Sequence, residues 1–480
     1  MSPINRRQFL SSGAVAVTAL SLSPSVWSQP TGANSDIRLA VVGFNGQGKS
    51  HIEGFRKLPG VRFVGLCDVD STVLDREASK FKDRNEKIAT YTDIRKLLEN
   101  KDIDAISIAT PNHWHALMAI WAVQAGKDVY VEKPVSHNVS EGRRIVEAAR
   151  KHKRIVQTGT QSRSNPGMRE AIKFLHDGGL GKIKWARGLC YKRRASIGKV
   201  TGAQHPPASV DYDLWCGPAP KEPLMRTKLH YDWHWVWPTG SGDLGNQGIH
   251  QMDLARWALG ETELSPRVFS FGGRFGYVDD GTTPNTQVIY HDYAKAPLIF
   301  EVRGLPAQTN GDKMDNFRGA SIGVLVQCEN GSMVIPSYSS ATAYDNSGKL
   351  IKQFKGEASH HGNFIQAVRS RKLSDLNADI LEGHLSSALC HTGNISYRMG
   401  SPSTPAKVKD ALKNEPEAAE SLAKLGEHLG ANNVDLGKTS IQLGAILKMN
   451  PKTERFTNNN KANAMLTRDY RKGFEVPNKV

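Results

Sequence analysis

The feature that most constrains the fold is a glycine-rich loop that directly follows an apolar segment of strand length. The segment 37–43 reads IRLAVVG, and the loop 43–48 reads GFNGQG. A helical pattern follows at 51–58, and a second apolar segment at 61–66 leads to the acidic Asp68. Strand, glycine loop, helix, strand and acidic residue in this order are typical of a dinucleotide-binding βαβ unit.

The predicted cofactor site is built first from this loop and from Asp68. Gly43, Gly46 and Gly48 let the turn close and let backbone N–H groups approach a pyrophosphate at a helix N-terminus. Asn45 occupies the place of a second glycine, and asparagine tolerates left-handed backbone better than most residues. An acid at position 68 holds the adenosine ribose hydroxyls and repels a 2′-phosphate. The sequence therefore predicts NAD; the alternative is a glycine turn that serves packing alone.

Strands and helices alternate over the region 37–158. The further strands expected there are 105–109, 129–131 and 155–157, and the further helices are 71–81, 114–125 and 140–152. This alternation predicts an α/β domain with a parallel sheet. From 159 to 400 the expected strands are longer and alternate more in polarity, which indicates a second domain with one solvated sheet face. The polar segment 401–480 is interpreted as a tail on the body or on a neighbouring subunit.

The first 28 residues have the pattern of a signal peptide, and a polar linker follows at 29–36. Arg6 and Arg7 precede an apolar run at 11–22 that is too short to span a membrane. The twin arginine followed by Phe-Leu resembles a Tat signal, which exports folded proteins. We therefore expect a periplasmic protein, free of the membrane once the signal is removed; the alternative is an N-terminal anchor.

Charge and cysteine content exclude several classes of protein. Lys and Arg number 63 against 47 Asp and Glu, a net charge of +16, but they are spread along the whole chain. Since no zinc-finger or RNA-binding signature accompanies them, no nucleic-acid partner is expected. Five distant cysteines exclude a disulfide scaffold and a CxxC zinc site, and no HExxH pattern is present, so no metal is predicted.

Two further segments end at the sheet edge where doubly wound folds bind ligands. The segment 128–134 reads DVYVEKP, and Pro134 favours an extended backbone at Lys133, which aims that side chain into the crevice. The segment 109–115 reads ATPNHWH and ends the preceding strand.

Together these segments resemble the Gfo/Idh/MocA family of sugar oxidoreductases. The resemblance covers about 37–398, and its most specific mark is the Glu-Lys-Pro turn at 132–134. It implies a Rossmann domain plus a C-terminal α/β domain with an open-faced, mostly antiparallel sheet, which often forms a homo-oligomer. The segment 458–477, which contains RDYR, resembles the tail of an exported branch.

The resemblance also assigns site residues. Those matched to cofactor binding are Gly43, Asn45, Gly46, Gly48, Asp68, Thr110, Pro111, Asn112, His115, Glu132 and Lys133. The segment 242–253 looks like the one that carries the family's catalytic histidine, so Lys133 and His250 are the catalytic candidates. Many dehydrogenase members have Asp where this chain has Asn246, and an amide cannot act as a base.

Spacing places Asp243, Asn246, His250 and Asp253 on one face of an expected helix, although Asp253 could equally serve structure. An imidazole with the ordinary pKa near 6.5 suits His250 as a base near neutral pH. Lys133 would need a lowered pKa, or would stabilise a developing alkoxide.

The expected substrate-binding residues are Asn246, Tyr191, Arg193 and Trp235. Indole faces stack on apolar sugar surfaces, although the tryptophans of this region could instead belong to the core.

Three functions stay open on the sequence. The first is an NAD-dependent oxidoreductase acting on a sugar, polyol or glycoside, with tightly bound, internally recycled cofactor, because export removes the protein from free NAD. The second is an NAD-dependent glycosidase that works by transient oxidation at C3 and elimination. The third is a non-catalytic sugar-binding protein.

Overall fold

The computed structural model describes residues 36–480. The predicted signal peptide at 1–28 lies outside the described residues, as does the linker up to residue 35. In the described part of the chain, no helix is long and apolar enough to cross a membrane.

The N-terminal sheet is parallel and has the strand order β3-β2-β1-β4-β5-β6. Its strands are β1 (Ile37–Val42), β2 (Val61–Cys67), β3 (Ala89–Tyr91), β4 (Ala105–Ile108), β5 (Asp128–Val131) and β6 (Val156–Thr158). The order reverses between β1 and β4, and a crevice opens there at the carboxyl ends of the strands. The predicted parallel α/β fold is confirmed.

The helices of this domain are α2 (Gly48–Arg56), α3 (Ser71–Lys82), α4 (Ile94–Glu99), α5 (Asn112–Gln124) and α6 (Val139–Lys151). Side chains fix where they begin: Asp70 accepts from Thr72 N and caps α3, and Asn138 accepts from Glu141 N and caps α6. Helix α5 has no solvated polar face, and eleven of its thirteen residues are buried, because other elements cover it on nearly every side.

The second sheet is mostly antiparallel, as predicted, with the order β14-β13-β12-β11-β7-β10-β9-β8-β16-β15; only β7 and β10 pair in parallel. Its strands are β7 (Ile183–Tyr191), β8 (Arg267–Gly273), β9 (Thr286–His291), β10 (Leu298–Arg303), β11 (Ile322–Cys328), β12 (Gly331–Ile335), β13 (Ser340–Asp345), β14 (Leu350–Lys355), β15 (Ser401–Ser403) and β16 (Ile441–Leu443). Strand β17 (Leu447–Asn450) pairs with β8 and with β18 (Arg455–Phe456).

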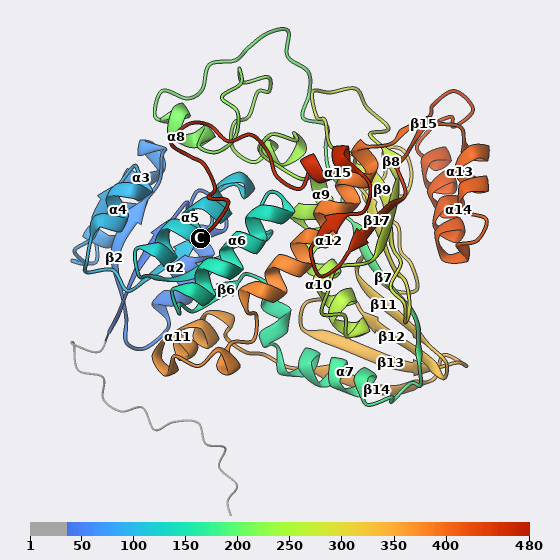
Figure 1. Ribbon diagram of the computed structural model, residues 1–480, viewed down its shortest axis with the longest axis horizontal. Coiled ribbons are helices and arrows are strands. Elements are labelled where there is room, and N and C mark those ends of the chain that lie inside the picture. Colours follow the sequence, from blue (N-terminus) through green and yellow to red (C-terminus); the bar gives the residue numbers. More distant parts are fainter. Residues whose placement is uncertain (1–35) are drawn as a thin grey trace, which may run out of the picture. The chain divides into compact units, whose positions relative to one another are not determined.

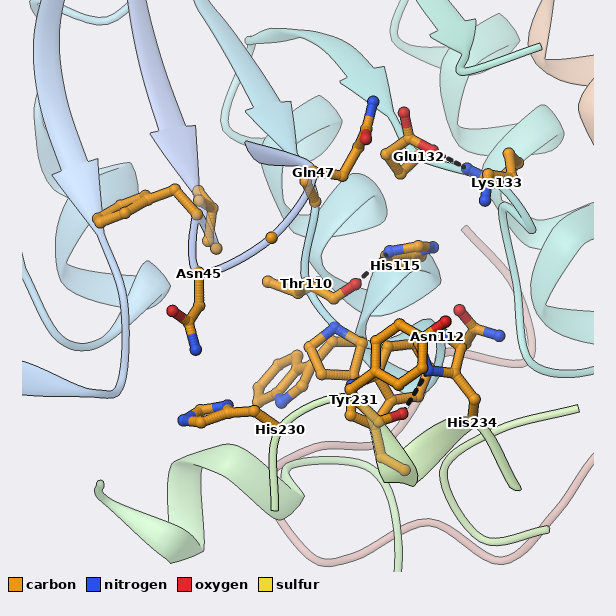
Figure 2. Close-up of a pocket in the computed structure, with 18 of the residues that line it drawn as sticks. Asn45, Gln47, Thr110, Asn112, His115, Glu132, Lys133, His230, Tyr231 and His234 are labelled. Carbon is orange, nitrogen blue, oxygen red and sulfur yellow. Dashed lines mark hydrogen bonds between the residues drawn. The ribbon is translucent and has the colours of Figure 1, made fainter. Parts of the chain in front are cut away.

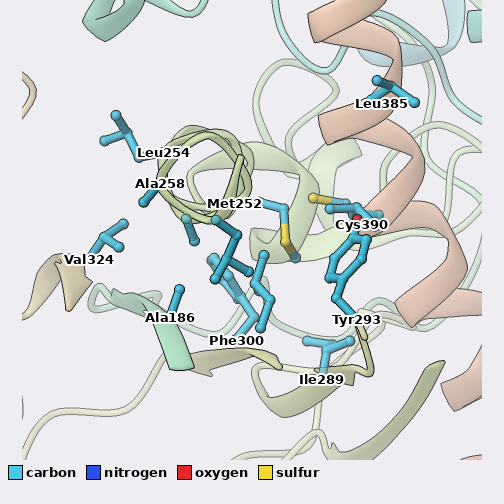
Figure 3. Close-up of a cluster of buried hydrophobic side chains, with 14 of the residues drawn as sticks. Ala186, Met252, Leu254, Ala258, Ile289, Tyr293, Phe300, Val324, Leu385 and Cys390 are labelled. Atoms are coloured by element: carbon cyan, nitrogen blue, oxygen red, sulfur yellow. The ribbon is translucent and has the colours of Figure 1, made fainter. Parts of the chain in front are cut away.

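Helices α7 (Pro166–His176), α10 (Gly248–Leu259) and α12 (Ile380–Arg398) pack on the inner face of this sheet. Figure 3 shows Phe300 of β10 beneath α10, among Met252, Leu254 and Ala258. A Cβ on Gly188 would lie 2.5 Å from the Phe300 ring, and one on Gly248 would lie 3.0 Å from it. The two glycines therefore allow α10 to pack close to the sheet. This close packing sets the distance of His250 from the sheet.

The outer face of the sheet is covered over β8–β10 by α13 (Pro405–Ala411) and α14 (Pro416–Ala431) (Figure 1). Val408, Leu425 and Leu429 of these helices pack against Phe271 and Tyr290. The open face implied by the family resemblance is therefore closed at these strands, because the chain supplies its own cover.

The segment 401–480 packs against both domains and forms part of their structure. Its strands β15–β17 extend the second sheet, and Phe474 and Val476 join the core of the Rossmann domain. The Phe474 ring packs edge-on against Trp114 of α5, with 5.5 Å between the centroids. The remaining helices are α8 (Tyr212–Cys216), α9 (Gly242–Asn246), α11 (His360–Ser370) and α15 (Asn460–Ala464), with 3-10 turns at Gln161–Ser164, Asp232–Trp235 and Leu373–Asp375.

Candidate active site

A cavity of about 720 Å³ lies between the carboxyl ends of the parallel strands and the second domain. Twelve of the residues singled out from the sequence line it: Gly43, Asn45, Gly46, Asp68, Thr110, Pro111, Asn112, His115, Glu132, Lys133, Asn246 and His250. Figure 2 shows the glycine loop on one side, the Glu132–Lys133 turn on another, and the segment with His230, Tyr231 and His234 facing them.

The glycine loop has a backbone conformation that would be strained in residues with a Cβ atom. Gly43 has φ +74°, and a Cβ there would lie 2.8 Å from Thr110 Cγ2. Gly48 does not line the cavity; a Cβ on it would lie 2.0 Å from Gly43 O, so it lets α2 start directly against the loop. The Asn45 side chain accepts a hydrogen bond from Arg76 Nη2 at 3.1 Å.

Asp68 closes the loop from the end of β2. Its carboxylate accepts from Phe44 N and from Asp70 N, each at 3.1 Å. Burial raises the pKa of Asp68, and the two backbone hydrogen bonds oppose that shift. Further donors such as ribose hydroxyls would stabilise this desolvated carboxylate, so the loop and its acid fit NAD.

Glu132 is buried beside the cavity and is held by a histidine that the sequence reading missed. His51 Nε2 lies 3.0 Å from Glu132 Oε1, and His51 Nδ1 lies 2.8 Å from Ser107 Oγ. Burial disfavours ionisation of Glu132, but the hydrogen bond and charge of His51, with the charge of Lys133, lower its pKa to about 2. Glu132 is therefore a carboxylate at any working pH.

His115 joins the two cofactor-side loops. Its Nδ1 lies 2.6 Å from Pro134 O and its Nε2 lies 2.7 Å from Thr110 O. Burial lowers the pKa of His115. Its two contacts therefore tie Thr110, which lines the cavity, to Pro134, which follows the lining residue Lys133.

Lys133 and His250 line the same end of the cavity from different domains. Lys133 Nζ donates to the backbone oxygen of Asn246 at 3.1 Å. Burial lowers the pKa of Lys133. Burial, and then the charge of Lys133, lower the pKa of His250 to about 3. The expectation of an imidazole with its ordinary pKa near 6.5 is therefore corrected: His250 is neutral near pH 7.

The expected continuous helix face is interrupted at Gln247, between α9 and α10. Asp243 accepts two hydrogen bonds from Arg194, at 2.7 and 2.8 Å. Asp253 is bound by the guanidinium of the buried Arg163, so this acid serves structure.

Three of the four expected substrate-binding residues lie away from the cavity. The Tyr191 hydroxyl donates to Glu301, Arg193 pairs with Asp312 on the surface, and the Trp235 ring lies beneath the Arg194 guanidinium. The physical reason along β7 and its extension is strand alternation: Tyr191 and Arg193 point one way, whereas Lys192 and Arg194 point into the cavity. Trp215 and Trp233 line the cavity in place of Trp235.

Further cavity residues also escaped the sequence reading. Lys192 Nζ donates to Gln247 Oε1 at 3.0 Å, and Gln247 Nε2 donates to the Tyr338 hydroxyl at 2.6 Å. The Tyr338 ring packs against His250, with 4.9 Å between centroids. Within residues 36–480, no group of three or more His, Cys, Asp or Glu side chains is arranged to hold a metal ion.

Comparison with known families identifies this arrangement. The family model described as "Oxidoreductase family, NAD-binding Rossmann fold" (GFO_IDH_MocA) matches residues 37–160, and the model of the family's C-terminal alpha/beta domain matches 182–303. The chain belongs to the Gfo/Idh/MocA family. The predicted family, its enzymatic nature and its NAD cofactor are thereby confirmed.

Curated relatives of this Gfo/Idh/MocA protein match it over a limited region. A glycosyl hydrolase family 109 protein of Shewanella putrefaciens is 36% identical over 172 residues, which is 31% of this chain and 38% of the relative. An alpha-N-acetylgalactosaminidase of Shewanella oneidensis matches with the same identity and coverage. The match therefore spans well under half of these relatives' length.

Solved structures share the fold over more of the chain. The WlbA dehydrogenase of Bordetella pertussis, solved with NADH and UDP-GlcNAcA, has a TM-score of 0.53 and 19% identity. It covers 74% of this chain and 94% of its own. At that identity the similarity establishes the architecture of the Gfo/Idh/MocA protein.

Proposed function

We propose that this enzyme oxidises a hydroxyl group of a sugar, polyol or glycoside with NAD that stays bound, and that reduction of a second sugar returns the bound NADH to NAD within the catalytic cycle. The observation that carries the proposal is the meeting of Lys133 and His250, from separate domains, at the end of the cavity next to Glu132. NAD supplies a hydride acceptor and donor there. Gly43, Asn45, Gly46 and Asp68 would hold its adenosine and pyrophosphate portion.

The protein groups divide the proton chemistry unequally. An imidazole whose pKa is about 3 holds a proton weakly, so neutral His250 serves best as a hydrogen-bond partner that orients the substrate hydroxyl. Burial lowers the pKa of Lys133, which brings its amine closer to the range of a working base. Lys133 is therefore our candidate for accepting the hydroxyl proton or for stabilising the alkoxide as it forms.

A second candidate is an NAD-dependent glycosidase. The names of the curated relatives, a family 109 glycosyl hydrolase and an alpha-N-acetylgalactosaminidase, favour it. In that reaction oxidation at C3 acidifies the C2–H bond, the glycosidic group is eliminated, and water and hydride are then returned. The first step requires the same protein residues, because both reactions begin by removing a proton from the substrate hydroxyl; the elimination further requires a base that takes the C2 proton and a proton for the leaving group.

One experiment separates the two candidates. The purified protein is incubated in deuterium oxide with a panel of nitrophenyl glycosides, including N-acetyl-α-galactosaminide, while NADH absorbance and product mass are followed. With no second sugar present to reoxidise the cofactor, a dehydrogenase gives NADH equal to the enzyme and no deuterium at C2. A glycosidase turns over repeatedly with deuterium at C2 and no net NADH. Neither signal with any glycoside, together with no nucleotide released by acid, would contradict the proposal.

We further propose that the protein reaches the periplasm folded, with its cofactor bound. All five cysteines are free and buried, which suits folding in a reducing compartment before export. Periplasmic extracts should contain the protein with NAD, and replacing Arg6 and Arg7 by Lys should retain it in the cytoplasm.

We also propose a homo-oligomer. Because α13 and α14 cover β8–β10, two copies would pair through the far end of the sheet, where Leu350 and Ile351 of β14 are exposed. Sedimentation velocity on Ile351→Lys tests this proposal.

A further inference from the structure

The substrate end of the cavity carries more positive than negative charge. Lys133, Lys192 and Arg194 line it. The charge of Arg194 is balanced by Asp243, and Glu132 is bound to His51. Within residues 36–480, neither Lys133 nor Lys192 forms an ion pair; the hydrogen-bond acceptors that their ammonium groups contact are the Asn246 backbone oxygen and the Gln247 amide oxygen.

Lys192 is held in place next to the catalytic candidates. Its ammonium donates to Gln247 Oε1, whose amide group in turn donates to the hydroxyl of Tyr338. The Tyr338 ring rests on His250. These three residues, Lys192, Gln247 and Tyr338, come from three separate connecting segments, and we call them the lysine row.

The lysine row is electrostatically coupled to the reacting groups. After burial, the charge of Lys133 and then that of Lys192 lower the pKa of His250. The charge of Lys192 likewise contributes to the lowered pKa of Lys133, after burial. An ammonium group has three donors, and the structure uses one of them on Gln247, so the half-buried Lys192 has donors left for a ligand in the cavity.

We propose that the lysine row is a subsite for an anionic substituent of the substrate, a carboxylate or a sulfate on the sugar whose hydroxyl is oxidised. An anion bound there would offset the electrostatic repulsion between the ammonium groups of Lys192 and Lys133. The row belongs to the second domain, whereas the glycine loop and Asp68 lie on the Rossmann domain, so the proposed anion is distinct from the cofactor pyrophosphate. This inference rests on the proposed function for its substrate class.

The test compares Lys192→Gln with Lys184→Gln, which removes an exposed lysine of β7, the strand that directly precedes Lys192. NAD-loaded wild type should have a kcat/KM roughly tenfold to a hundredfold higher for nitrophenyl glucuronide or a 6-sulfated glucoside than for the neutral glucoside. Lys192→Gln should abolish that ratio, Lys184→Gln should keep it, and both should retain NAD. The glucuronide and sulfate arms identify which anion is preferred.

A binding measurement keeps this test independent of turnover. Tryptophan fluorescence of the NAD-loaded protein is titrated with glucuronate, glucose 6-sulfate, glucose and inorganic sulfate. An acidic sugar that binds more tightly than glucose, with the difference lost in Lys192→Gln alone, supports the subsite. If this result is obtained and no glycoside reacts, the proposed function fails while the subsite stands. Equal binding of neutral and acidic sugars, binding of inorganic sulfate alone, or loss of NAD from Lys192→Gln would overturn the proposal.

Discussion

The Lys133 ammonium group donates a hydrogen bond to the backbone oxygen of Asn246, with 3.1 Å between Nζ and O. This bond joins the two domains at the candidate active site and does not involve the Asn246 side chain. That side chain instead directs Nδ2 towards Asp243, 3.4 Å from Oδ1. The residue type at position 246 can therefore change while the contact to Lys133 is kept.

Replacing Asn246 by Asp should raise NADH formation in a single turnover relative to glycoside cleavage. The new carboxylate adds negative charge near Lys133 and can accept a proton, which the amide cannot do. Rapid-mixing absorbance of NADH and the release of nitrophenol measure the two outcomes. Asn246→Ser is the matched control without a charge; an equal response of the two variants would contradict this role for the carboxylate.

Lys133→Met and His250→Ala should each lower turnover by about 10²–10⁴-fold, the usual loss when a positioned acid, base or hydrogen-bond partner is removed. Steady-state rates measure the effect, and nucleotide released by acid checks that NAD is retained. Lys184→Met, on the exposed part of β7, serves as control. Turnover like that of the wild type in either variant would remove that residue from the mechanism.

Asp68→Asn should weaken NAD binding by roughly tenfold and reduce the preference for NAD over NADP. The carboxylate is the charged acceptor at the end of β2, and an amide accepts more weakly and no longer repels a 2′-phosphate. Calorimetric titration of both nucleotides into stripped protein gives the two affinities. The exposed Asp75→Asn on α3 is the control, and unchanged affinities in Asp68→Asn would show that another residue holds the ribose.

Acid should destabilise the fold from about pH 6.5 downwards to about pH 3. Burial lowers the pKa of several histidines to about 3 or 4: His113, His234, His250, His291, His360, His361 and His391. In this range the unfolded chain binds protons that the native state does not, so the free energy of unfolding falls as pH falls.

Urea unfolding at several pH values measures this loss of stability. The variant His291→Leu, within β9 and away from the cavity, should have a weaker pH dependence. The slope of its free energy of unfolding against pH should be smaller by up to about 1.4 kcal/mol per pH unit. The exposed His205→Gln should leave it unchanged. A stability that does not vary between pH 7 and pH 4 would show that the buried histidines gain protons in the native state.

Gly43→Ala should reduce NAD retention more than it reduces overall stability. The added Cβ would meet Thr110 at 2.8 Å and would impose a side chain on a backbone with φ +74°. Thermal unfolding and nucleotide content measure the two effects. Gly46→Ala is the comparison, because a Cβ on Gly46 has no neighbour within 4 Å.

The Rossmann half was predictable because its signals are local in the chain. The loop, its helix and Asp68 lie within about 30 residues, and their order alone dictates where they meet. The same holds for the ends of β4 and β5, which bring Thr110 and Lys133 to the cavity because parallel strands share one carboxyl edge.

The substrate half was less predictable because distant residues decide it. The residues at 191–194 are large or charged at every position, so no alternation in the sequence indicates that Lys192, and not Tyr191, faces the cavity. The choice depends on Glu301, which accepts the Tyr191 hydroxyl from 110 residues away. Tyr338 reaches the site from 91 residues beyond Gln247, in a loop without a recognisable motif.

The end of the chain fastens one wall of the cavity from outside. Arg471 binds Asp213 of α8, whose neighbours Leu214 and Trp215 line the cavity, and Phe474 packs on Trp114, which lines it as well. Tyr470 anchors the same segment to Glu141 of α6. For a bound dinucleotide to leave past this wall, these contacts must first be broken. Cofactor exchange by that route would be limited by local unfolding of the segment 470–476, and the lifetime of the loaded enzyme would then depend on these residues.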